Sequence, residues 1–231
     1  MYKKLLLFDF DETLVRITDL HSLAWKDTIG DIGLSDSIEI LLPPERFRIE
    51  RFDSTQRIIR YFFQRKNNKF ILENFFNTSD HEYIANQMLD IKESHLLYLI
   101  NELNYSEIVY RLAPNFLAVC DMLNKKYDFG IISSTRQSVI YSFLDKANLV
   151  DVFKYIVGEE ALRYNGRLYD KPSGRALTSV LEQMPKNTIC AYIGDDVRID
   201  ALFAKNIKTT YIQASAKDDF MNLLPTIEEV T

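Results

Sequence analysis

The chain carries two kinds of hydrophobic pattern. Residues 4–10 form a short apolar run followed by polar residues, which is typical of a strand buried on both faces. From Asp19 to about Tyr110, apolar residues instead recur every three or four positions. This spacing predicts helices, one near residues 20–32 and a longer one near residues 84–103, and no strand.

A different pattern begins at about residue 111, where short apolar runs alternate with helical periodicity. We predict strands at residues 128–133, 153–157, 189–193 and 209–213, and helices at residues 115–126, 137–147, 173–184 and 197–205. Such alternation favours right-handed βαβ units and a parallel sheet covered on both faces. We therefore expect an α/β fold in which residues 1–15 and 111–231 form a Rossmann-like core and residues 16–110 form an inserted all-α domain.

Composition and charge narrow the class of protein. The chain has 231 residues, of which 47% are hydrophobic and 26% charged, close to globular averages. Its net charge of -5 argues against a nucleic-acid partner, because such binding needs an excess of Lys and Arg. No apolar run approaches the ~20 residues of a membrane span, and the N-terminus lacks a small-residue cleavage site. We therefore expect no membrane association and a cytoplasmic location, with Cys120 and Cys190 as buried thiols.

Carboxylates follow two of the predicted strands. Asp9 and Asp11 come after the first strand, and Asp195 follows the strand at 189–193. Ligands bind beyond the carboxyl ends of the strands in an open parallel sheet, so these side chains are expected to meet there. Together they would form a hard oxygen cluster suited to Mg²⁺, which usually binds phosphate-bearing substrates. The sequence therefore predicts Mg²⁺ as the cofactor and a small phosphorylated molecule as the substrate.

Groups that can hold a phosphate lie near the same edge. Ser133 and Ser134 close the strand at 128–133, and Lys171 precedes the predicted helix at 173–184. Lys171 and Mg²⁺ would offset the repulsion between carboxylates and a phosphate, while the Ser133 hydroxyl would hold another phosphoryl oxygen. A role as N-cap of the following helix is the alternative for the two serines.

The spacing of Asp9 and Asp11 suggests how a reaction is divided between them. In strand geometry the intervening Phe10 points away and both carboxylates face one side. One carboxylate can then attack phosphorus while the other handles a proton. We expect Asp9 to be the nucleophile, forming an aspartyl-phosphate, and Asp11 to protonate the leaving oxygen and later activate water.

Four short motifs, in this order, resemble those of the haloacid dehalogenase superfamily. They are DFDETL at 9–14, Ser133 in GIISST, Lys171 in DKPSG, and GDDVRID at 194–200. The resemblance implies a phosphatase in which Asp195 binds the metal with Asp196 or Asp200 assisting. It also implies that Thr13 supports the loop, and the second Asp of DFDETL points away from dehalogenation. The metal ligands named on this basis are Asp9, Asp11, Asp195 and Asp200.

The helical insertion resembles a type C1 cap, which closes over the active site in this superfamily. Residues 20–34 are similar to the first cap helix of β-phosphoglucomutase-like and phosphoglycolate phosphatase-like members, and His21 is expected to face the substrate. The sequence departs from the superfamily pattern at Glu12, where Gly is usual. It also has KPSG in place of the commoner Lys-Pro-x-Pro, a change that keeps the lysine.

The function predicted from these features is hydrolysis of a small phosphomonoester by a Mg²⁺-dependent enzyme. A sugar phosphate, a nucleoside monophosphate and a phosphoglycolate-like molecule all suit the core, because the core contacts the phosphoryl group. A β-phosphoglucomutase-like phosphosugar mutase and a nucleotidase are alternatives that use the same chemistry. A non-catalytic binding protein is a remoter alternative.

Overall fold

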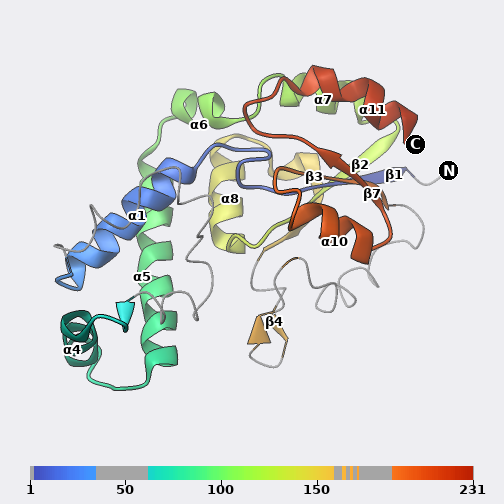
Figure 1. Cartoon of the computed structure of the whole chain (residues 1–231). Helices are drawn as coiled ribbons and strands as arrows, with labels where there is room; N and C mark the ends of the chain where they lie inside the picture. Colours follow the sequence, from blue (N-terminus) through green and yellow to red (C-terminus); the bar gives the residue numbers. More distant parts are fainter. Residues whose placement is uncertain are drawn as a thin grey trace. The chain divides into compact units, whose positions relative to one another are not determined.

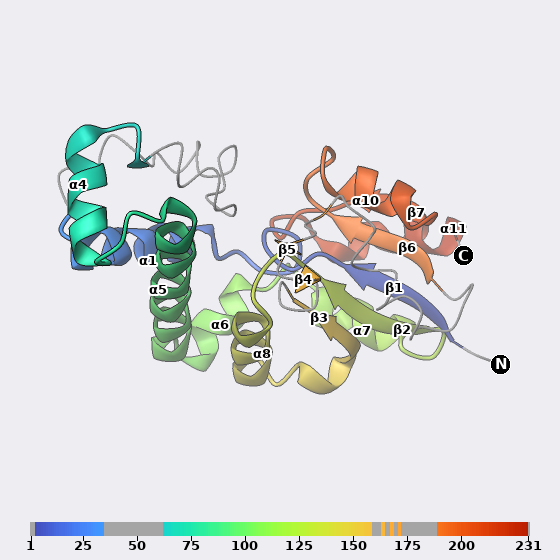
Figure 2. The same ribbon diagram turned by 90° about the horizontal axis from the view of Figure 1, so that it is seen from below.

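The computed structural model describes residues 3–34, 62–158, 163–164, 167–168, 171 and 189–230. A five-stranded parallel sheet lies at the centre of the larger of its two units (Figure 1). The strand order is β3-β2-β1-β6-β7, so the first strand of the chain is the middle one (Figure 2). The strands are β1 (Lys4–Phe8), β2 (Tyr127–Ile132), β3 (Phe153–Val157), β6 (Ile189–Gly194) and β7 (Thr210–Gln213).

Helices cover both faces of this sheet. Two helices that are far apart in sequence, α7 and α11, lie on one face, and α10 lies on the other (Figure 1). The described helices of this unit are α6 (Tyr105–Arg111), α7 (Phe116–Leu123), α8 (Gln137–Lys146), α10 (Asp200–Asn206) and α11 (Leu224–Glu229). Two 3-10 turns, η2 (Val150–Val152) and η4 (Phe220–Leu223), and a short antiparallel pair, β4 (Arg163–Tyr164) with β5 (Arg167–Leu168), complete the described elements.

The uninterrupted apolar run of β1 is explained by its position between two layers. The ring of Phe8 packs against Phe116 of α7, with ring centroids 5.9 Å apart. Leu5 and Leu7 belong instead to a buried cluster that includes Phe203 of α10. Successive side chains of a strand point to opposite faces, so β1 needs apolar residues throughout its buried part, Leu5 to Phe8.

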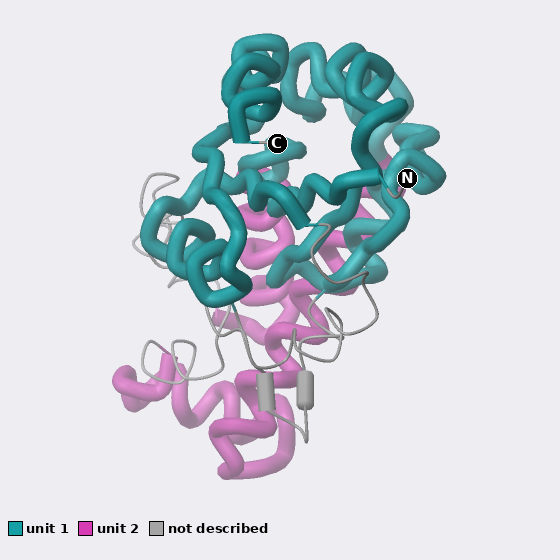
Figure 3. The backbone as a smooth tube through the Cα atoms, turned by 90° about the vertical axis from the view of Figure 1, so that its right-hand side faces the viewer, with its two compact units in different colours: residues 1–17, 103–231 teal, residues 18–102 magenta. Residues whose placement is uncertain are grey.

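The chain divides into two compact units, coloured separately in Figure 3. One contains residues 1–17 and 103–231, and the other contains residues 18–102. The sequence placed the insertion at 16–110, a range that includes α6. In the structure α6 belongs with the sheet, where Lys146 of α8 donates a 2.9 Å hydrogen bond to the carbonyl of Leu103.

The smaller unit is helical in all its described parts. The helices described in it are α1 (Thr18–Asp31), α4 (Lys66–Phe75) and α5 (His81–Glu102). Trp25 and Ile29 of α1 form a buried cluster with Ile84 and Met88 of α5. These positions recur at helical spacing, so one face of each helix is buried against the other.

The predicted α/β class is confirmed, with differences at the ends of elements. The first strand ends at Phe8 rather than at residue 10, because the chain then turns tightly and Glu12 adopts a positive φ of 58°. The last helix of the predicted set begins at Asp200 rather than at 197, since residues 197–199 form a turn. The helix predicted at 173–184 lies outside the described residues.

A helix that crosses a bilayer needs about 20 predominantly apolar residues. The longest described helix, α5, has 22 residues but carries several charged side chains. Within the described parts of the chain, no helix combines sufficient length with sufficient apolar character to span a membrane.

Candidate active site

The carboxylate of Asp9 is buried directly beyond the end of β1. Asp9 is 2% exposed, and its backbone N–H donates to the carbonyl of Ile193 on the adjacent strand β6. Phe10 is also buried, and its ring meets that of Phe143 on α8 edge to face at 5.8 Å. The turn that ends β1 therefore sends Asp9 to the sheet edge and Phe10 into the core.

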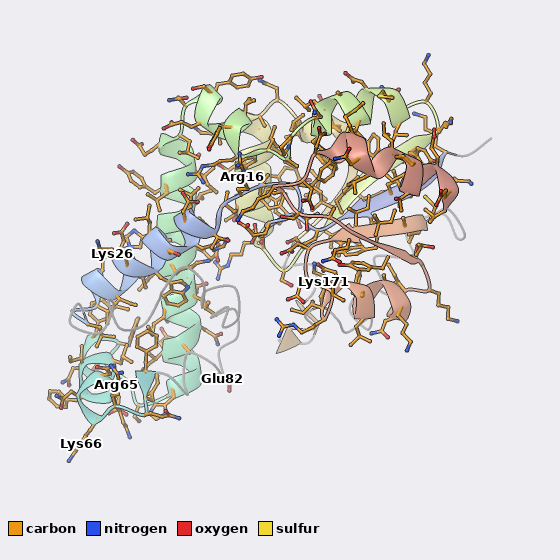
Figure 4. All side chains as sticks on the ribbon, turned by 45° about the horizontal axis from the view of Figure 1, so that its top comes forward. Arg16, Lys26, Arg65, Lys66, Glu82 and Lys171 are labelled. Carbon is orange, nitrogen blue, oxygen red and sulfur yellow. The ribbon has the colours of Figure 1, made fainter. Side chains whose placement is uncertain are left out.

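Lys171, which is labelled in Figure 4, lies in the same unit as the sheet. Its ammonium group is beside two carboxylates. Its Nζ is 2.6 Å from Oδ1 of Asp9 and 2.9 Å from Oδ1 of Asp200. It also lies 2.8 Å from the hydroxyl of Tyr192. Burial by itself would lower the pKa of Lys171, but the carboxylates of Asp9 and Asp200 hold it well above its ordinary value. The lysine is therefore a buried, fully charged cation.

Three carboxylates gather around this lysine. Oxygen atoms of Asp9, Asp195 and Asp200 all lie within 4.8 Å of one another, and they form the metal-competent acidic group found among the described residues. Carboxylate oxygens are the donors that Mg²⁺ prefers, so this group fits the predicted cofactor. The carboxylate of Asp11 is not part of the group, and its role as a metal ligand stays a prediction.

The turn between β6 and α10 sets the position of Asp200. Oδ2 of Asp200 accepts a 3.0 Å hydrogen bond from the backbone N–H of Asp196, whose own carboxylate accepts from the N–H of Arg198. A Cβ atom on Gly194 would lie 2.4 Å from Oδ2 of Asp200, so only glycine leaves room for this carboxylate. Of the two residues proposed to assist Asp195, the structure brings Asp200 into the group, and Asp196 stabilises the turn.

The loop after β2 contacts Asp11. The hydroxyl of Thr135 donates a 2.6 Å hydrogen bond to Oδ2 of Asp11, and both residues are buried. Ser133, also buried, accepts a 3.2 Å hydrogen bond from the N–H of Thr135 at its own hydroxyl oxygen. Ser134 is only half-buried. Thus Ser133 and Thr135 order this loop beside the first one.

Thr13 and Glu12 complete the first loop. Thr13 is fully buried, and its hydroxyl makes a long contact of 3.5 Å with Oδ1 of Asp195. The backbone N–H of Glu12 donates to the carbonyl of Val15, and its carbonyl accepts from the N–H of Ala216. Its positive φ is a conformation that Gly adopts without steric cost, which explains why Gly is usual there.

His21 lies in the helical unit rather than in the sheet unit. Its Nδ1 is 2.7 Å from Nζ of Lys92, a buried lysine that also bonds to Glu93 at 2.7 Å. An ammonium group can only donate, so Nδ1 accepts, and in the neutral ring the hydrogen is on Nε2. The predicted contact of His21 with the substrate stays a prediction.

Sequence reasoning assigned no role to three residues that the structure joins to the candidate set. Thr135 and Tyr192 contact Asp11 and Lys171 respectively, and Lys92 contacts His21. Tyr192 had one local signal, a polar hydroxyl within an otherwise apolar strand. Lys92 had none, because a lysine between helical apolar positions usually faces solvent.

A doubly wound parallel sheet whose carboxyl edge holds an acidic group and a buried lysine defines an α/β enzyme. The chain belongs to the haloacid dehalogenase-like hydrolase family, whose sequence profile matches residues 3–208. The superfamily resemblance predicted from the four motifs is thereby confirmed. No curated protein sequence matches the chain.

Several solved structures share this fold. CbbY from Rhodobacter sphaeroides in complex with xylulose-(1,5)-bisphosphate has 15% identity and a TM-score of 0.67, covering 93% of this chain and 87% of that one. β-Phosphoglucomutase from Clostridium difficile has 16% identity and a TM-score of 0.58, covering 99% and 98%. The HAD-hydrolase candidate YfnB from Bacillus subtilis, bound to magnesium, has 16% identity and a TM-score of 0.61, covering 99% and 100%. At these identities the likeness shows the fold alone.

Proposed function

We propose that this hydrolase is a Mg²⁺-dependent phosphatase that cleaves the phosphomonoester of a small metabolite through an aspartyl-phosphate on Asp9. The observation that carries the proposal is the position of Asp9, which belongs to the three-carboxylate group and lies 2.6 Å from Nζ of Lys171. A carboxylate alone would repel a phosphate. A metal ion and an ammonium group beside the carboxylate make its surroundings attractive to a phosphate.

The first step forms a bond between a carboxylate oxygen of Asp9 and phosphorus, while the bond from phosphorus to the leaving oxygen breaks. Asp11, as a carboxylic acid, donates its proton to that oxygen. The hydrogen bond from Thr135 supports this role because it restrains the Asp11 side chain. Lys171 and Ser133 bind the other phosphoryl oxygens.

The second step releases phosphate and restores Asp9. The carboxylate of Asp11 accepts a proton from water, and the water oxygen bonds to phosphorus as the ester bond to Asp9 breaks. Bound Mg²⁺, held by Asp9, Asp195 and Asp200, would supply positive charge that offsets the charge of the phosphoryl oxygens. Asp11 thus acts as an acid in one step and as a base in the other.

The helical unit is proposed to be the cap that contacts the rest of the substrate. Sugar phosphates, nucleoside monophosphates and phosphoglycolate-like molecules are the candidate substrates. We also propose a cytoplasmic location, which is supported by two free thiols, that of the buried Cys120 and that of the half-buried Cys190.

Phosphate release from a panel of phosphomonoesters, measured with Mg²⁺ and with EDTA, tests the proposal. We expect metal-dependent release that is abolished in Asp9→Asn and reduced about 10²-fold or more in Asp11→Asn. The exposed Asp121 on α7 provides a matched control, since Asp121→Asn should leave release unchanged. Mass spectrometry after acid quenching should find the covalent phosphate on Asp9.

Two results would contradict the proposal. Release that persists in Asp9→Asn would exclude the aspartyl-phosphate. Bisphosphate-dependent isomerisation of a sugar phosphate without net release would assign the protein to the mutases instead.

A further inference from the structure

Tyr192 is a fully buried tyrosine in β6 whose hydroxyl makes two hydrogen bonds. It lies 2.8 Å from Nζ of Lys171 and 2.9 Å from the carbonyl oxygen of Ile132. A carbonyl can only accept, so the single phenolic hydrogen goes to Ile132. The phenolic oxygen then accepts from Lys171. Both bonds therefore have a defined direction.

These bonds account for the third hydrogen of the lysine. An ammonium group has three N–H donors, and the contacts of Lys171 are with Asp9, Asp200 and Tyr192. Two of these partners are carboxylates of the metal-competent group. In the proposed reaction Asp9 changes partner when it bonds to phosphorus, whereas the hydroxyl of Tyr192 takes no part in bond making. Tyr192 can therefore hold Lys171 through the whole cycle.

The second bond of the hydroxyl connects Lys171 to the end of β2. Ile132 is the last residue of that strand and directly precedes Ser133, which is proposed to bind a phosphoryl oxygen. The backbone N–H of Ser133 is in turn bonded to the carbonyl of Val157 on β3. The phenol of Tyr192 thus links Lys171 with the strand end next to Ser133, and both Lys171 and Ser133 are proposed to bind the phosphoryl group.

The ring of Tyr192 is held rigidly. Tyr192 lies opposite Leu7 of β1 in the register of the sheet. Its ring packs against that of Phe203 on α10, with centroids 4.9 Å apart and an interplanar angle of 69°. Close-packed side chains of this kind keep one rotamer, so the hydroxyl has a set position. Preorganised donors and acceptors are effective because they need no rearrangement during the reaction.

We propose that Tyr192 is a positioning residue that aims the ammonium group of Lys171 at the phosphoryl group. The inference rests on the proposed phosphatase function. It assigns a catalytic consequence to a hydroxyl that hydrogen-bonds to Lys171 and to the carbonyl of Ile132.

A double-mutant cycle on the full chain tests this inference. Tyr192→Phe, Lys171→Met and the double variant are assayed on the best phosphomonoester of the panel. We expect Tyr192→Phe to lower kcat/KM about 10- to 100-fold, as is common when a partner of an active-site group is removed. If Tyr192 acts through Lys171, the double variant should be no worse than Lys171→Met alone, whereas a structural effect would multiply the two losses.

A second readout does not depend on turnover. We expect phosphate to bind more weakly to Tyr192→Phe when Mg²⁺ is present. Its dissociation constant, measured by calorimetry, should rise about three- to ten-fold, the size expected when one hydrogen bond to a charged group is lost. A smaller folded fraction raises the apparent constant only in inverse proportion to that fraction, which urea titrations measure separately. Tyr127→Phe is the matched control, because Tyr127 is a buried tyrosine at the opposite, amino-terminal end of β2. It should leave both readouts unchanged.

The outcomes separate the inference from the function on which it rests. Unchanged kcat/KM and unchanged phosphate binding in a folded Tyr192→Phe, or losses that multiply in the cycle, would overturn the inference alone. A wild type that neither releases nor binds phosphate would overturn both. If urea titrations show that Tyr192→Phe is unfolded, Tyr192→Met takes its place in the cycle. This variant also lacks the hydroxyl, and its flexible side chain can fill the space of the ring.

Discussion

The hydroxyl of Thr135 donates a 2.6 Å hydrogen bond to a carboxylate oxygen of Asp11, a residue 124 positions earlier in the chain. The two loops that carry these residues follow adjacent parallel strands, β1 and β2. The contact restrains the side chain proposed to move a proton in both steps. A residue to which the four motifs assign no role therefore bears directly on the proposed chemistry.

Replacing Thr135 with valine removes this hydrogen bond and keeps the shape of the side chain. We expect kcat for phosphate release to fall about 10-fold because the Asp11 side chain is less well oriented. This fall corresponds to a rise of about 1.4 kcal/mol in the activation free energy. Thr28→Val is the matched control, since Thr28 is equally buried and bonds to the carbonyl of Ala24 in the helical unit. Equal losses in the two variants would show that the effect on Thr135 is one of folding.

Lys171 should stabilise the fold up to strongly alkaline pH. Although burial opposes its charge, the carboxylates of Asp9 and Asp200 hold the pKa of Lys171 well above its ordinary value. Its contribution is then fully present below the unfolded pKa of about 10.4 and is lost as the pH rises through the folded pKa. Urea unfolding in EDTA should give a difference between wild type and Lys171→Met of about 3–5 kcal/mol at pH 7 and at pH 9.

The same difference should shrink at pH 11, because the folded lysine then holds a proton that the unfolded one has released. Measurements at several pH values between 7 and 11 give the whole curve. A difference that already declines between pH 7 and pH 9 would contradict a raised pKa.

Gly194→Ala should impair metal binding more than folding. The added Cβ would lie 2.4 Å from Oδ2 of Asp200 and would push this carboxylate away from Asp9 and Asp195. We expect at least about a 10-fold weaker affinity for Mg²⁺ in calorimetry, as when the surroundings of a metal ligand are altered. Gly30→Ala is the control, because a Cβ there meets nothing within 4 Å, and in helix α1 alanine should stabilise by about 1 kcal/mol.

Glu12 allows a test of backbone strain. Its φ of 58° is accessible to glycine but costs other residues roughly 1 kcal/mol. Glu12→Gly and Glu12→Ala both remove the carboxylate, so the glycine variant should be more stable in urea unfolding by about that amount. Ser94→Gly and Ser94→Ala, within helix α5, are the control pair. There the order should reverse, and the alanine variant should be the more stable one. The same order at both positions would argue against strain at Glu12.

The sequence predicted the sheet well because its signals are local. A strand buried on both faces must be largely apolar, as β1 is from Leu5 to Phe8. The predicted ends of β1, β2, β3, β6 and β7 lie within two residues of the observed ends. Asp9, Ser133 and Asp195 also follow strand ends, and a parallel sheet puts such ends at one edge. Lys171 and Asp200 were named from the order of the four motifs. The carboxylates Asp9, Asp195 and Asp200 and the lysine Lys171 could thus be named in advance.

Only the tertiary structure decided which of these side chains touch. The choice of Asp200 over Asp196 depends on the turn after β6 and on the space left by Gly194. The contacts of Thr135 with Asp11 and of Tyr192 with Lys171 depend on the strand order, which puts β1 between β2 and β6. Hydrophobic periodicity says which face of a strand is buried, but not which strand lies beside it. Both neighbours of β1 come from more than a hundred positions away, and packing between such distant residues selects them.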